Sequence, residues 1–132
     1  MNKRLVPLLL SAVAALAVVM FARQGEERFD TVNADRFAMT IDSAGVQIVD
    51  VRTPAEYAEG HIPGAVLLDV KSNGFAREAE RKLDVARTVA VYCRSGKRSA
   101  DAARILSELG YRVINLSGGI TEWKDDGRPT ER

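Results

Sequence analysis

The sequence predicts an α/β domain with about five parallel strands and with helices on both faces of the sheet. Short apolar runs alternate with segments whose apolar residues recur at helical spacing, a pattern typical of parallel strands joined by right-handed crossovers. The clearest strand, residues 88–92, is almost wholly apolar, as a strand covered on both faces should be. A length of 132 residues allows one such domain and a short appendage.

The first elements are a strand, a helix and a second strand. Residues 29–32 form the expected first strand. Asn33 then caps a helix with one apolar face, and Gly45 stops it. A second apolar strand over residues 46–51 completes the first crossover unit.

A short helix, a short strand and a longer helix come next. Residues 53–56 form a capping box with proline at the first helical position, and the helix that they open runs to Gly60. A turn leads into a strand over residues 65–68, and helical spacing predicts a helix over residues 71–83. The remaining elements are strands over residues 88–92 and 112–116 and helices over residues 99–109 and 117–123.

The N-terminus is a separate object. Lys3 and Arg4 precede residues 5–22, which carry no charge, and this arrangement predicts a signal peptide or a signal anchor over residues 1–22. The small-residue cleavage candidates would leave apolar residues at the new N-terminus, which favours an uncleaved anchor with its basic end in the cytoplasm. A buried core helix is the alternative. We therefore expect a domain exported to the periplasm or anchored at the inner membrane.

The expected domain boundaries follow from these elements. A polar juncture over residues 23–28 leads to the domain proper at residues 29–129, and residues 130–132 form a tail.

Composition excludes several classes of function. The formal charge of +1 is too small for a protein whose main role is to bind nucleic acid through a basic surface. One cysteine and one histidine cannot build a closed zinc site or an internal disulfide, so no metal and no cofactor is expected.

The only cysteine, Cys93, stands at a strand-to-helix turn. A helix N-terminus favours the thiolate over the thiol, and Arg94, Lys97 and Arg98 act in the same direction. A lone thiol excludes dithiol exchange within the chain. His61 could form a cysteine–histidine dyad only through the fold, and beside a proline–glycine turn it is better interpreted as a residue that binds the backbone.

The loop after the cysteine is built from small residues. Gly96 lets the backbone curl so that N–H groups converge, while Ser95 and Ser99 leave the pocket open. Such a pocket suits an oxyanion or another anion. The residues therefore predict transfer of a group, either sulfane sulfur or a phosphoryl group, onto an activated sulfur.

Three segments resemble the rhodanese family of sulfurtransferases. They are DVRTPAEYAEGHIPGA at residues 50–65, VYCRSGKRS at residues 91–99, and LSGGITEW at residues 116–123 followed by GRP at residues 127–129. All three occur in the family's order and together span the whole body. The resemblance implies a Cys93 persulfide that takes sulfur from thiosulfate or a similar donor and passes it to cyanide or a thiol.

The nearest rival on the same fold is the cell-cycle dual-specificity phosphatase domain. Cysteine-dependent phosphatases of that kind need an arginine six positions after the cysteine. Ser99 occupies that position here, and Arg98 stands one residue earlier. The shorter loop favours sulfur over phosphate or arsenate chemistry. A non-catalytic or sulfur-carrying module at the membrane is a further alternative.

Several charged residues carry two interpretations each. Arg94 and Lys97 either bind the substrate anion or are solvated. Arg98 either binds substrate or folds inward to hold the loop, pairing with a carboxylate such as Asp50, which would then support the loop. Arg52 either touches substrate or pairs with a glutamate of the following helix, Glu56 or Glu59. The expected partners are a small sulfur-containing anion or persulfide and possibly a thiol acceptor protein, and the expected state is a monomer.

Overall fold

A computed structural model describes residues 29–132 of the chain. The predicted signal segment at residues 1–22 and the polar juncture at residues 23–28 lie outside the described residues. Among the helices of residues 29–132, none has the length and apolar character needed to cross a membrane.

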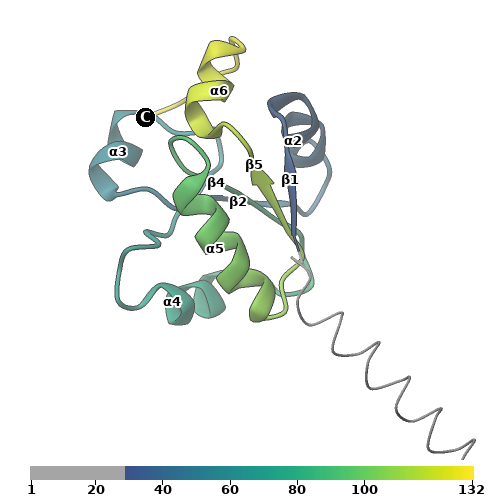
Figure 1. Ribbon diagram of the computed structural model, residues 1–132, viewed down its shortest axis with the longest axis vertical. Coiled ribbons are helices and arrows are strands. Elements are labelled where there is room, and N and C mark those ends of the chain that lie inside the picture. The colour runs from purple at the N-terminus through teal and green to yellow at the C-terminus, as the bar shows by residue number, and fades with distance from the viewer. Residues whose placement is uncertain (1–28) are drawn as a thin grey trace, which may run out of the picture.

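Five parallel strands form one sheet in the order β1-β5-β4-β2-β3 (Figure 1). The strands are β1 (Phe29–Val32), β2 (Gln47–Asp50), β3 (Val66–Leu67), β4 (Val89–Tyr92) and β5 (Val113–Leu116). In this order β4 is central, and its carboxyl end lies between those of β2 and β5. Ligands of open parallel sheets collect at that edge.

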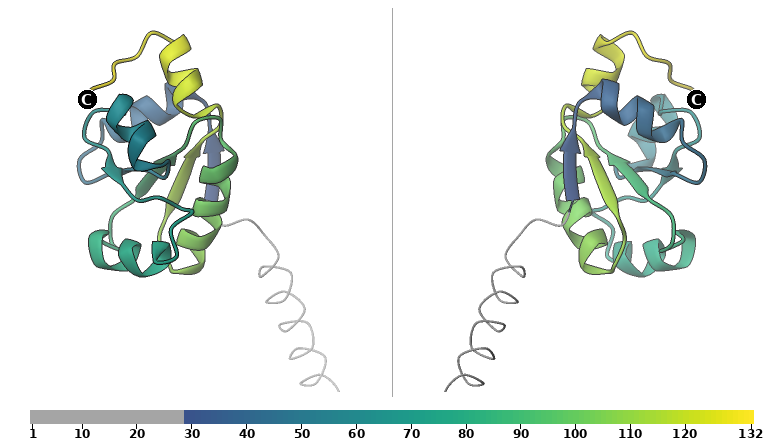
Figure 2. Two further views of the ribbon diagram at one scale, coloured as in Figure 1. Left: turned by 90° about the vertical axis from the view of Figure 1, so that its left-hand side faces the viewer. Right: turned by 90° about the vertical axis from the view of Figure 1, so that its right-hand side faces the viewer.

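Helices cover both faces of the sheet (Figures 1 and 2). They are α2 (Ala34–Ile41), α3 (Pro54–Glu59), α4 (Phe75–Lys82), α5 (Lys97–Glu108) and α6 (Gly119–Asp125). Apolar side chains of α4 and α5 pack on one face in one core cluster, and those of α2, α3 and α6 pack on the other face in a second cluster. The predicted α/β class with a five-stranded parallel sheet is confirmed.

The central strand explains why its sequence is apolar throughout. All four residues of β4 are buried. Val91 and the following Cys93 belong to the α4–α5 core, whereas Ala90 and Tyr92 belong to the opposite core. Since successive side chains of a strand point to opposite faces, this run fills both cores at once.

Local chemistry sets where the helices begin. The Asn33 side chain accepts the backbone N–H of Arg36 at 2.9 Å, as its capping role predicts. In contrast, α4 begins at Phe75, so the predicted start at residue 71 is wrong. Residues between Asp69 and Gly74 form turns instead, because the Asp69 carboxylate accepts the Lys71 N–H at 2.9 Å and ends the extended chain there.

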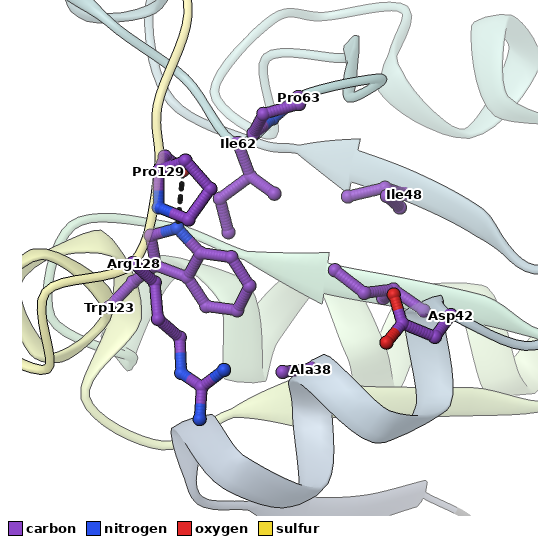
Figure 3. Close-up of a pocket in the computed structure, with 9 residues that line it drawn as sticks. Ala38, Asp42, Ile48, Ile62, Pro63, Trp123, Arg128 and Pro129 are labelled. Atoms are coloured by element: carbon purple, nitrogen blue, oxygen red, sulfur yellow. Dashed lines mark hydrogen bonds between the residues drawn. The ribbon is translucent and has the colours of Figure 1, made fainter.

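The C-terminal residues are bound to the domain rather than trailing from it. Trp123 donates its indole N–H to the Pro129 carbonyl at 2.7 Å (Figure 3). Beyond it, Glu131 and His61 exchange two backbone hydrogen bonds of 2.8 and 2.9 Å. Trp123, Pro129 and Ile62 also line a cavity of about 300 Å³, and none of its lining residues belongs to the loop that follows Cys93.

Candidate active site

The thiol of Cys93 lies at the carboxyl end of β4, just before α5. The residue is only 1% exposed. Its Sγ accepts a hydrogen bond from the Gly96 backbone N–H at 3.1 Å and one from the Ser99 hydroxyl at 3.3 Å. The loop therefore bends around the sulfur, as predicted for an anion cradle.

Two opposing influences act on the pKa of the Cys93 thiol. Burial, the largest single influence, raises the pKa because it disfavours the charged form. The Ser99 hydroxyl and the backbone N–H groups of Ser99, Gly96 and Ser95 together outweigh it, and the pKa is lowered from its ordinary value. The sulfur is thus stabilised as thiolate by directed donors rather than by exposure to water.

Only glycine fits at the bend of the loop. Gly96 has a φ of 101°, in the left-handed region, and directly precedes the first turn of α5. A Cβ at this position would also collide with the backbone carbonyl oxygen of Ser117. Both the backbone conformation and the close approach of the segment after β5 therefore require glycine here.

The first residues of α6 bind the backbone of the thiol loop, a role that the sequence analysis did not predict. The Ile120 N–H donates to the Cys93 carbonyl at 2.9 Å, and the Thr121 N–H donates to the Arg94 carbonyl at 3.2 Å. A Cβ on Gly119 would collide with both of these carbonyl groups. Since the carbonyls point to α6, the third sequence motif serves the thiol loop and not merely a turn. Its adjacent glycines were the signal that could have revealed this.

Arg98 folds inward to a carboxylate, as predicted, but the carboxylate is Glu56 and not Asp50. The two terminal nitrogens of Arg98 donate to the two Glu56 oxygens at 2.7 and 2.9 Å. Hydrogen bonding to Arg98 is the main reason why the pKa of Glu56 is lowered to about 2. Asp50 does not pair with Arg98 because its carboxylate already accepts hydrogen bonds from Arg52 and Tyr92.

Asp50 and Arg52 form a buried ion pair at the end of β2. The Arg52 guanidinium donates to Asp50 at 2.7 Å and to the Gly60 carbonyl at 2.7 Å, and the Tyr92 hydroxyl donates to Asp50 at 2.8 Å. Asp50 is 0% and Arg52 is 4% exposed. Arg52 therefore pairs with neither Glu56 nor Glu59, and we assign it to support of the rim rather than to substrate contact.

The remaining predicted site residues are three exposed residues of the thiol loop and His61. Arg94, Ser95 and Lys97 are exposed at the mouth of the loop, and neither basic side chain forms an ion pair within residues 29–132. The His61 ring contacts the Tyr57 carbonyl at 2.9 Å and stacks on the Tyr57 ring at 3.7 Å, which confirms its predicted backbone role. Across the described part of the chain, no cluster of three or more acidic, histidine or cysteine side chains could hold a metal ion.

Comparisons with known proteins agree with this geometry. A family model described as a rhodanese-like domain matches residues 33–126. A protein of Allochromatium vinosum named sulfurtransferase is 46% identical over 89 residues, which cover 67% of this chain and 80% of that protein. The thiosulfate sulfurtransferase PspE of Escherichia coli is 38% identical over 74 residues, or 56% of this chain and 70% of its own.

A solved structure shows the same arrangement of elements. It is a rhodanese-related protein from Thermoplasma volcanium, with a TM-score of 0.68 and 30% sequence identity, and the match covers 78% of this chain and 98% of that chain. The relatives named sulfurtransferase support a rhodanese-type sulfurtransferase in general. The resemblance carried by the three sequence motifs is confirmed: this chain belongs to the rhodanese-like domain family.

Proposed function

We propose that the protein moves sulfane sulfur from thiosulfate or a similar donor to a thiophilic acceptor, cyanide or a thiol, through a persulfide on Cys93. One observation carries the proposal. The Cys93 sulfur accepts hydrogen bonds from the Gly96 N–H and the Ser99 hydroxyl at the base of a loop of converging donors. That environment favours a thiolate and suits the negative charge of a persulfide.

In the first step the Cys93 thiolate attacks the outer sulfur of thiosulfate. A new S–S bond forms to Sγ, and the S–S bond of thiosulfate breaks with its electron pair leaving on sulfite. The outer sulfur of the Cys93 persulfide then carries the negative charge. The backbone N–H groups of Ser95, Gly96 and Ser99, which already favour the thiolate, supply the donors that stabilise it.

In the second step the acceptor attacks the outer sulfur of the persulfide. The S–S bond to Sγ breaks, its electron pair returns to the Cys93 thiolate, and cyanide leaves as thiocyanate or a thiol leaves as its persulfide. No other oxidant or reductant is required. The two half-reactions share a covalent intermediate, so ping-pong kinetics are expected.

The remaining residues divide into two groups. Arg94 and Lys97, exposed at the mouth, attract the anionic donor. Arg98, held by Glu56, supports the loop from the side, and Asp50 supports the neighbouring strand end through its pair with Arg52. Of all these side chains, only Cys93 forms a covalent bond with the cargo.

Ser99 supports sulfur transfer over phosphate chemistry. It occupies the position where the related phosphatases need an arginine. Here the residue is 0% exposed and its hydroxyl is bound to the Cys93 sulfur. Serine has no guanidinium to bind a phosphate group, and its hydroxyl is already bound to the sulfur.

The test is thiocyanate formation from thiosulfate and cyanide by the purified protein. The wild type is expected to turn over with ping-pong kinetics, and mass spectrometry after donor treatment should show one added sulfur on Cys93. A Cys93→Ser variant is the control. Wild-type protein that makes no more thiocyanate than this control would refute the sulfur-transfer proposal, and Cys93-dependent hydrolysis of an aryl phosphate would favour the phosphatase alternative.

We also propose that the domain works outside the cytoplasm as a monomer, tethered or released through residues 1–22. The support is the basic start followed by an uncharged apolar run in the sequence. Fractionation of bacteria that express the full chain tests the export, N-terminal sequencing tests whether the segment is cleaved, and size-exclusion chromatography tests the monomer. Protein found only in the cytoplasm with an intact N-terminus would refute the export proposal.

A further inference from the structure

Glu56 connects two helices that frame the thiol. It lies in the first turn of α3, where its Oε1 accepts the Thr53 backbone N–H at 3.3 Å and the Thr53 hydroxyl at 3.1 Å. The same carboxylate binds both terminal nitrogens of Arg98 at 2.7 and 2.9 Å. One side chain thus joins the N-terminus of α3 to the first turn of α5.

The first turn of α5 carries two cations and no acidic residue of its own. The cations are Lys97 and Arg98, although a helix N-terminus disfavours positive charge. Glu56 supplies the missing negative charge. The side chains of Arg98 and Glu56 are only 22% and 26% exposed. Because hydrogen bonding to Arg98 lowers the pKa of Glu56 to about 2, the carboxylate is charged at neutral pH.

Arg98 belongs to the loop that bends around the thiol. It lies between Gly96 and Ser99, the two residues that donate to the Cys93 sulfur. The pKa of Arg98 is raised, first by its hydrogen bond to Glu56 and further by the negative charge of the Cys93 thiolate. A guanidinium fixed in this place holds both the turn and its charge against the sulfur, whereas a released one is free to turn to solvent.

We propose that Glu56 is a positioning residue for the thiol, which acts through Arg98 to hold the Gly96–Ser99 turn and its charge against the Cys93 sulfur. This inference deepens the proposed sulfurtransferase function, since it concerns the reactivity of the same thiol. The simpler possibility is that Glu56 only caps α3 through Thr53. The two roles differ in whether Glu56 and Arg98 act as one unit.

The experiment follows Cys93 itself across pH in the full chain. Because the sequence contains one cysteine, the rate of thiol alkylation by iodoacetamide reports on it alone. Glu56→Gln and Arg98→Met should each move the alkylation profile to higher pH and slow alkylation at neutral pH about three- to tenfold. The double variant should be no slower than the slower single variant, because both changes remove the same interaction.

Two matched controls separate positioning from capping. Thr53→Ala removes the cap and leaves the ion pair, so it should lower the unfolding midpoint without moving the profile. Glu59→Gln removes an exposed carboxylate of the same helix and should change neither. If Glu56→Gln does not fold, Glu56→Asp replaces it, and the retained but shorter carboxylate should give a smaller shift in the same direction.

Three results would overturn the proposal. They are a Glu56→Gln profile that stays in place or moves to lower pH, additive effects in the double variant, and a Thr53→Ala profile equal to that of Glu56→Gln. Alkylation requires no sulfur donor, so the result is independent of whether the wild type makes thiocyanate.

Discussion

The carboxyl ends of β2 and β4 lie side by side in the sheet, and both carry ionisable groups, but they use them differently. At the end of β2 the charges of Asp50 and Arg52 satisfy one another inside the protein. At the end of β4 the Cys93 sulfur is surrounded by donors of the loop, and the cations Arg94 and Lys97 extend to the surface. The charges at the end of β2 neutralise each other, whereas the donors at the end of β4 are arranged to bind an anion.

The difference shows that charge near a strand end does not by itself mark a binding group. A guanidinium whose donors are taken by a carboxylate and a carbonyl has little left for a ligand, as with Arg52. The thiol loop instead relies on the Ser99 hydroxyl and on backbone N–H groups, which only Gly96 signals in the sequence. We therefore expect changes at the end of β2 to affect stability and changes at the end of β4 to affect reactivity.

The largest effect should come from Asp50→Asn, which leaves the buried Arg52 charge without its counterion. Removing one partner of a buried pair costs about 3–5 kcal/mol. Urea unfolding followed by circular dichroism measures the change. Asp101→Asn is the control, because its pair with Arg104 is exposed and should contribute about 0.2–1 kcal/mol. Equal losses of unfolding free energy in the two variants would contradict the assignment of Asp50 and Arg52 as a buried, mutually neutralising pair.

At the end of β4, Gly96→Ala should nearly abolish sulfur transfer. The new Cβ would collide with the Ser117 carbonyl and strain a left-handed backbone, so the donors would move away from Sγ. A displacement of about 1 Å costs on the order of 100-fold in rate, and thiocyanate formation measures it. Gly74→Ala, at a position with nothing within 4 Å, should keep full activity. An active Gly96→Ala enzyme would contradict the role given to the loop.

Ser99→Ala should have a smaller effect on the same thiol. The hydroxyl favours the thiolate and so lowers the pKa of Cys93; without it the pKa rises and less thiolate exists at neutral pH. We expect alkylation at neutral pH to slow about threefold or more, with the profile moved to higher pH. Ser107→Ala, also buried in α5 but bound to the Arg104 carbonyl, should leave the profile unchanged. A profile that does not move in Ser99→Ala would remove the hydroxyl from the cradle.

The smallest effect should follow the loss of the exposed charges. Arg94→Gln and Lys97→Gln are each expected to raise the KM for thiosulfate about two- to fivefold at low salt, since they attract the donor without contacting the sulfur. The difference from wild type should disappear at high salt, where such attraction is screened. Steady-state kinetics at two ionic strengths measure this, with Arg104→Gln as the surface control. An effect that persists at high salt would indicate direct contact with the donor.

Much of the fold was predictable because its signals are local. The apolar run of β4 and the caps at Asn33 and Thr53 depend on nearby residues, and all three are confirmed. The start of α4 was predicted too early. The apolar residues at helical spacing begin only at Phe75, and turns after Asp69 occupy the residues before it.

The site was predictable in its residues but not in its partnerships. Cys93 and its loop are recognisable from one contiguous segment. The partner of Arg98 is on another helix 42 positions away, and Glu56 already had a complete local explanation as a capping residue. Likewise, the adjacent glycines at the start of α6 signal a close approach, but nothing local shows that Gly119 packs on the backbone of Cys93 and Arg94. Contacts between distant segments depend on the sheet order, which the sequence pattern did not establish.

The hydrogen bonds from Ile120 and Thr121 to the loop also bear on the order in which the site can form. The segment that holds the Cys93 and Arg94 carbonyls comes after the cysteine in the chain and is synthesised later. A growing polypeptide that has been synthesised only as far as α5 already contains the cysteine. It still lacks the N–H groups of α6 that orient the thiol loop. The thiol loop therefore reaches its folded form only after α6 has been synthesised and has docked, and a chain truncated before α6 would carry an unformed site.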